Sequence, residues 1–165
     1  MNISIPEIHK ANQVLWLALL IGAIIITGIF AQMNFGDPDF LNFNNFITSI
    51  FTAIASVITL LSVFLPNPLV RNRIENSNAG TLSDKFAHFR ADTVFKSALH
   101  EGPALICAIF MHLEGNFYFI FLVAINLIML FTARPTIKRF KDRYKLSSTE
   151  SEELNSMEFL PLLSP

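Results

Sequence analysis

The run Ala11–Gly36, ANQVLWLALLIGAIIITGIFAQMNFG, contains no charged residue and sets the class of the protein. A hydrocarbon core of roughly 30 Å needs about 20 helical residues, and this run is long enough to provide them. Its apolar part exceeds the roughly 7–15 residues of a signal-peptide core, so we expect a retained span over residues 12–33. Trp16 lies near its start, where an amphipathic ring suits the membrane interface.

Three further apolar stretches follow, and we predict spans at about 46–66, 94–113 and 115–134. The second closes at Leu65-Pro66-Asn67-Pro68 and the fourth at Arg134-Pro135. Proline cannot continue the hydrogen-bond ladder of a helix, so both spans should end there. The composition agrees, because the chain is 52% hydrophobic and only 15% charged, against roughly 25% charged in soluble domains.

The predicted fold is therefore an all-α, integral membrane four-helix bundle formed by residues 1–146. Upstream of the third span, apolar residues recur at helical spacing, which predicts an amphipathic helix that Thr81 or Ser83 caps. These residues are Leu82, Phe86, Phe89 and Thr93.

Residues 147–165 form an acidic tail that we expect on the cytoplasmic side. Ser147 with Glu150 has capping-box spacing, so a short helix through Leu154 is predicted. The apolar end, Phe159–Leu163, is expected to touch the membrane surface or a partner, or to be disordered.

Basic residues predict the orientation of the spans. The connections 33–45 and 113–116 contain no Lys or Arg, whereas the connection 71–93 and the segment 134–145 are rich in both. The positive-inside rule then places both termini in the cytoplasm of a multi-pass protein of the inner membrane.

A faint repeat is compatible with two tandem helical hairpins that start on the same side. It pairs Ala11, Ala18, Leu19, Gly22, Ile29 and Phe30 with Ala91, Ala98, Leu99, Gly102, Ile109 and Phe110.

Glu101 is the strongest candidate for a functional residue, because an ionisable group inside a membrane is costly and is usually functional. It lies roughly 18 Å below Leu113 at about 1.5 Å per residue, and Asn126 lies at a similar depth in the fourth span. Pro103 removes an amide and is expected to bend the helix beside it. His100 and Gly22 complete this candidate polar or ion site, because a glycine at this depth would admit a close neighbour.

Three interpretations of Glu101 remain open at this point. A neutral carboxyl would hydrogen-bond Asn126 or Ser97 and hold the bundle together, whereas an ionisable one would carry protons or cations. The remaining alternative is a site for a polar ligand.

The sequence offers no catalytic, cofactor or metal motif. His100-Glu101 begins like the zinc motif H-E-x-x-H, but Ala104 occupies the second histidine position. Cys107 is the single cysteine, so an intramolecular disulfide is excluded. The net charge of −1 gives no reason to expect nucleic acid. An enzyme is therefore the minority interpretation.

Of the six bases between residues 134 and 145, five are candidates for contact with the membrane surface, and each is worth about 1 kcal/mol near an anionic leaflet. We expect them to contact lipid headgroups, with a cytoplasmic partner as the alternative. They are Arg134, Lys138, Arg139, Lys141 and Arg143.

The chain resembles small bacterial membrane proteins of four spans. The resemblance rests on the stretch Ala98–Leu105, on Arg134-Pro135 at the end of the fourth span and on the basic-to-acidic tail, and it supplies no activity. A weaker resemblance is to the proteolipid subunits of rotary ATPases, whose hairpins carry one membrane carboxylate. The chain departs from that pattern, because it lacks their glycine repeats and Glu101 lies on the first helix of its hairpin.

We therefore expect a small membrane subunit or scaffold, self-associated or part of a larger membrane complex, with membrane lipids as partners. The alternatives are a proton- or cation-conducting protein and an intramembrane lipid-modifying enzyme.

Overall fold

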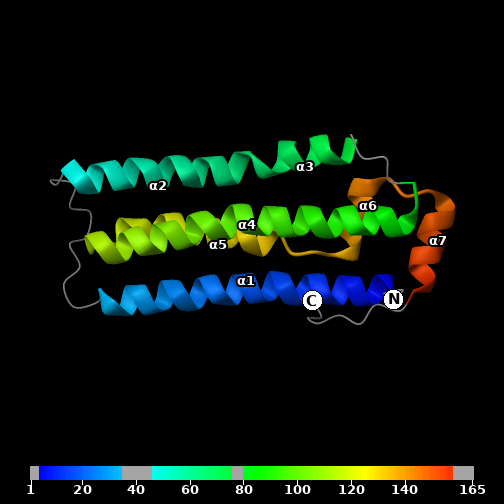
Figure 1. The fold of residues 1–165 in the computed structure, drawn as a ribbon, viewed down its shortest axis with the longest axis horizontal. Helices are drawn as coiled ribbons and strands as arrows, with labels where there is room; N and C mark the ends of the chain where they lie inside the picture. Colours follow the sequence, from blue (N-terminus) through cyan, green and yellow to red (C-terminus); the bar gives the residue numbers. More distant parts are fainter. Residues whose placement is uncertain (1–3, 35–45, 76–79, 158–165) are drawn as a thin grey trace.

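The computed structural model describes residues 4–34, 46–75 and 80–157, and over these ranges the protein is helical with no strand. Four long helices lie side by side along one axis (Figure 1). They are α1 (Ile5–Met33), α2 (Phe46–Phe64), α4 (Leu82–Glu114) and α5 (Tyr118–Thr132). Three shorter helices gather at the end where the chain begins (Figure 1). They are α3 (Pro66–Glu75), α6 (Ile137–Tyr144) and α7 (Ser148–Ser156).

The predicted all-α membrane architecture is confirmed. Three segments are long and apolar enough to cross a membrane: Ile5–Met33, Phe46–Ile74 and Leu82–Glu114. A fourth crossing arises if α5 and α6, which meet at an angle of 78°, form one broken span. The helix within the predicted span 115–134 is shorter than expected, because it begins only at Tyr118 and ends at Thr132.

The predicted amphipathic helix and the third span form one continuous helix, α4, of 33 residues. The backbone N–H of Asp84 donates to the Thr81 hydroxyl at 3.2 Å, so Thr81 is the N-cap. Pro103 lies inside α4 without dividing it into two helices. Gly115, with φ of 62°, ends α4 in the left-handed conformation that glycine adopts readily.

Prolines stand where α2 and α5 end, as their positions in the sequence predict. Leu65 separates α2 from α3, and Pro66 is the first residue of α3, where a missing amide costs little. The two helices continue in nearly the same direction (Figure 1). After α5, in contrast, the chain turns sharply, and Thr136 caps α6 by accepting from the backbone N–H of Arg139 at 3.3 Å.

Helix α4 is the centre of the bundle and contacts α1, α2, α3, α5 and α6. It runs parallel to α1, because His9 lies against Phe86 near one end and Phe30 stacks on His112 near the other. Trp16 does not lie at a lipid interface as the sequence suggested. It is buried, and its indole N–H donates to the carbonyl of Leu130 on α5 at 2.9 Å.

Residues 147–157 of the tail pack onto the end of the bundle where the chain begins. Ser147 caps α7 as predicted, and Leu154 on this helix is 1% exposed. Lys85 on α4 donates to both carboxylate oxygens of Glu150 at 2.7 and 2.8 Å. The expectation for Phe159–Leu163 concerns residues outside the described ranges.

Candidate functional site

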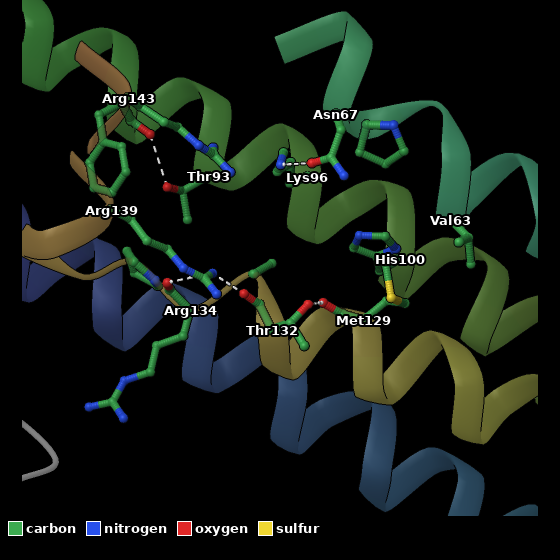
Figure 2. Close-up of a pocket in the computed structure, with 14 residues that line it drawn as sticks. Val63, Asn67, Thr93, Lys96, His100, Met129, Thr132, Arg134, Arg139 and Arg143 are labelled. Carbon is green, nitrogen blue, oxygen red and sulfur yellow. Dashed lines mark hydrogen bonds between the residues drawn. The ribbon is translucent and has the colours of Figure 1, made fainter. Parts of the chain in front are cut away.

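A polar cavity of about 260 Å³ lies where α2 gives way to α3 and where α5 turns into α6. The central helix α4 forms its remaining wall (Figure 2). Its lining consists of Val63, Pro66, Asn67, Phe89, Thr93, Lys96, His100, Met129, Thr132, Ala133, Arg134, Pro135, Arg139 and Arg143. The cavity therefore forms where both proline-containing breaks meet α4.

The charge of this lining is entirely positive. Lys96 comes from α4, Arg139 and Arg143 come from α6, and no Asp or Glu of the described ranges lines the cavity. Arg134 also borders it, but its side chain points away from the other bases (Figure 2). Cations brought together without a carboxylate attract an anion strongly where water is partly excluded.

Lys96 lies at the centre of one wall and is 8% exposed. Its ammonium group donates to the side-chain oxygen of Asn67 at 2.5 Å, across from α4 to α3. Among the described residues, no carboxylate forms an ion pair with it. The Lys96 side chain is therefore turned into the protein.

Arg139 is positioned by the turn between α5 and α6. Its guanidinium donates to the backbone carbonyls of Thr132 and Arg134, the latter at 3.2 Å. Burial, together with the nearby charge of Arg143, lowers the pKa of Arg139 from its ordinary value. The repulsion between two like charges is a cost that a bound anion would relieve.

His100 lies at the deeper end of the cavity, near Met129 and Val63 (Figure 2). It is 3% exposed, and its ring Nδ1 has no hydrogen-bond partner in the described part of the chain. A buried polar atom without a partner is uncommon in proteins and indicates an unfilled binding capacity.

Asp92, which lies one helical turn before Lys96 on α4, makes its contacts outside the cavity. It is 3% exposed and accepts a hydrogen bond from the Tyr144 hydroxyl at 2.8 Å. Arg73 lies 3.7 Å from its other oxygen. Burial and the bond to Asp92 raise the pKa of Tyr144, so the phenol stays a donor. This contact holds α6, with its two arginines, against α4.

Glu101 and Pro103 do not line this cavity, which we call the basic cavity after its lining of Lys and Arg. Both are partly exposed on α4, and Glu101 makes no hydrogen bond or ion pair within the described ranges. Gly22 does not serve a close approach, because no atom lies within 4 Å of a Cβ built there. The expected cluster around Glu101 is therefore not assembled within the described chain.

Asn126 belongs to a different polar cluster, shared between α5 and α2. It is 0% exposed and accepts from the Ser62 hydroxyl at 2.5 Å. Its amide donates to the Thr59 hydroxyl at 3.0 Å and to the Leu122 carbonyl at 2.9 Å. These bonds use the amide fully, so Asn126 holds two helices together rather than bonding Glu101.

Of the five bases expected at lipid headgroups, Arg134 borders the cavity with its side chain pointing away, and the other four divide into two groups. Lys138 is exposed on α6, and Lys141 donates to the Asn155 side chain at 2.5 Å. Arg139 and Arg143 instead turn into the cavity. Sequence reasoning missed this convergence, although one signal was present, because Lys96 and His100, like Arg139 and Arg143, are spaced one helical turn apart.

The comparisons add no relative that would assign an activity. Protein-family models, curated proteins and solved structures all give no match to the chain. Within the described ranges, no group of three or more His, Cys, Asp and Glu side chains is placed to hold a metal ion.

Proposed function

We propose that this protein is a small integral membrane protein that binds an anionic ligand in the basic cavity. The observation that carries the proposal is the lining itself, in which Lys96, Arg139 and Arg143 converge without a carboxylate. Burying charge without a partner is costly, and an anion of matching size would supply the missing partner. Arginine suits this role because its planar guanidinium can donate two parallel hydrogen bonds to one oxyanion.

The cavity is proposed to lie at the cytoplasmic face of the inner membrane. The charge pattern of the connections supports this orientation, because the bases of α3, α6 and the start of α4 belong to one end of the bundle (Figure 1). Single cysteines introduced between residues 35 and 45 should react with an impermeant thiol reagent from outside the cell. Cysteines replacing Lys138 should not, and the buried Cys107 of the parent chain provides a low background.

Ion conduction through Glu101 and lipid modification are the alternative functions. Conduction would need further polar groups along the helices, and within the described ranges Glu101 has no polar partner. The basic cavity brings several polar groups together, so anion binding is the function that the geometry supports best. A role as a subunit in a homo-oligomer or larger complex is compatible with this binding function.

Anion binding can be tested with the purified protein in a neutral detergent. Phosphate or sulfate should raise the melting temperature relative to chloride at equal ionic strength, because these anions have more oxygen acceptors. Arg143→Gln and Lys96→Gln should each lose most of this shift. Lys138→Gln removes an exposed base from the same helix as Arg143 and should keep it. Equal melting temperatures in all three salts would contradict the proposal.

A further inference from the structure

The basic cavity has two chemically different ends. Arg139 and Arg143 lie at one end, and Val63 and Met129 lie near His100 at the other (Figure 2). Val63 belongs to α2 and Met129 to α5, two helices whose outer surfaces are apolar. A ligand that matches both ends carries an anionic head and an apolar part.

The charge of the lining indicates what kind of head this is. Three cationic side chains line the polar end with no carboxylate, and Asp92 is occupied by Tyr144 and Arg73. A phosphate diester carries a single negative charge and two unesterified oxygens. A phosphate monoester carries about −1.5 to −2 at pH 7 and has three such oxygens. Three cationic donors without a carboxylate match the larger charge and the third oxygen of a monoester better than they match a diester.

The volume sets a further limit. About 260 Å³ holds a phosphate group and the few atoms next to it, but not a pair of acyl chains. The apolar part of a lipid would therefore leave the cavity past Val63 and Met129 and lie against α2 and α5. Large apolar side chains on the outer faces of these helices provide a surface for it, among them Leu60, Leu61 and Ile128.

We propose that the ligand of the basic cavity is a phosphate monoester carried by a lipid, an inference that rests on the proposed anion site. Its phosphate lies among Lys96, Arg139 and Arg143, and its apolar part follows α2 and α5. The Lys96 ammonium has three N–H groups and gives one to Asn67, so it can also donate to the phosphate.

A second hollow gives a soluble phosphate, rather than a lipid phosphate, a route to the same cations. It measures about 520 Å³ between α3 and α6 and shares Asn67, Lys96 and Arg143 with the basic cavity. A soluble phosphate could reach the same cations through it. The experiment must therefore separate a lipid phosphate from a free one.

The test compares the melting temperature and lipid affinity of the protein in nanodiscs of different composition. Phosphatidylcholine discs receive phosphatidic acid, phosphatidylglycerol at equal charge density, or inorganic phosphate in the buffer. We expect phosphatidic acid to bind about tenfold more tightly than phosphatidylglycerol at pH 8, because its extra charge and oxygen each find a donor. This preference should shrink at pH 5, below the second ionisation of the monoester at about 6.

Single substitutions test whether the preference for phosphatidic acid depends on the basic cavity. Arg143→Gln and Lys96→Gln should abolish it, and Lys138→Gln should retain it. Arg143→Lys keeps the charge and tests the geometry if Arg143→Gln fails to fold, with an expected partial loss. If both anionic lipids bind equally to the parent protein and neither binds to Arg143→Gln, the monoester inference is overturned and the anion site remains. Stabilisation by inorganic phosphate alone would overturn the lipid carrier, and a lack of response to every anion would overturn both proposals.

Discussion

Two regions of this molecule differ in the side chains that they bury. In the membrane-spanning helices, a few large residues such as Phe119 and Met111 are buried together with many polar or small ones, whereas large aliphatic residues face outward. The buried set includes Thr27, Thr48, Thr59, Ser62, Ala55, Ala108 and Asn126, and the outward set includes Ile24, Ile25, Ile29, Leu60 and Ile128. At the other end, α4, α6 and α7 enclose a core of Leu82, Phe86, Phe89, Phe140, Tyr144 and Leu154.

This difference follows from the two solvents. Lipid tails are as apolar as leucine, so apolar burial does not drive the spans together, and small side chains and hydrogen bonds do so instead. The other end carries most of the charged side chains of the described chain, and burial of apolar area from water gives roughly 25 cal/mol per Å². The basic cavity lies between these regions, where neither mode of packing fills the space.

The largest effect is expected from Leu154→Ala in the aromatic core. Leu154 is 1% exposed, and truncating a buried leucine typically costs about 2–5 kcal/mol in the free energy of unfolding. Unfolding measured in mixed micelles would give the value, with Glu153→Ala on the exposed side of α7 as the control. If both variants unfold like the parent chain, α7 does not stabilise the bundle and the aromatic core does not depend on Leu154.

Asn126→Leu tests the opposite kind of packing and should cost about 1–2 kcal/mol. The substitution removes the amide that bonds the Ser62 and Thr59 hydroxyls, which keep only the Thr59 carbonyl and the Cys107 thiol as partners. Ile128→Leu is the matched control, because Ile128 lies on α5 but is largely exposed. An Asn126→Leu protein that is more stable than the parent would show that apolar packing outweighs hydrogen bonding here.

Much of the fold could be predicted from the sequence, because hydropathy and proline positions reflect local physics. The spans, the cap at Thr81 and the helix start at Ser147 depend on neighbouring residues alone. The packing of α7 could not be predicted in this way. Leu154 is one apolar residue in an acidic segment, and its burial depends on the aromatic residues of α4 and α6.

The candidate site was predicted less well for the same reason. Glu101 is conspicuous in the sequence because a charge stands in an apolar run, but the described structure gives it no partner. Arg139 and Arg143 resemble an ordinary topology signal. Only the 78° turn between α5 and α6 brings them to Lys96, and a turn angle is not encoded in hydropathy.

A smaller, pH-dependent effect is expected at the ion pair that joins α7 to α4. Hydrogen bonds from Lys85 and from Ser147 lower the pKa of Glu150 relative to the unfolded chain. The stabilisation is therefore present above the unfolded-state pKa and is lost as pH falls through the lower folded-state pKa. Glu150→Gln keeps the capping box and removes the charge. It should be less stable than the parent at pH 7, and the difference should shrink as the pH falls below the ordinary glutamate pKa of about 4.3, whereas Glu152→Gln should match the parent throughout.

The smallest effect is expected at Glu101, the residue that the sequence made most conspicuous. It is partly exposed and has no hydrogen-bond partner in the described chain, so Glu101→Gln and Glu101→Leu should both stay within about 0.5 kcal/mol of the parent in unfolding free energy. Asn126→Leu provides the contrast, because there a bonded group is removed. A large loss in Glu101→Leu but not in Glu101→Gln would reveal a polar partner outside this copy of the chain and indicate self-association. Proton or cation flux in liposomes that Glu101→Gln abolishes would instead support conduction and move the functional site from the basic cavity to α4.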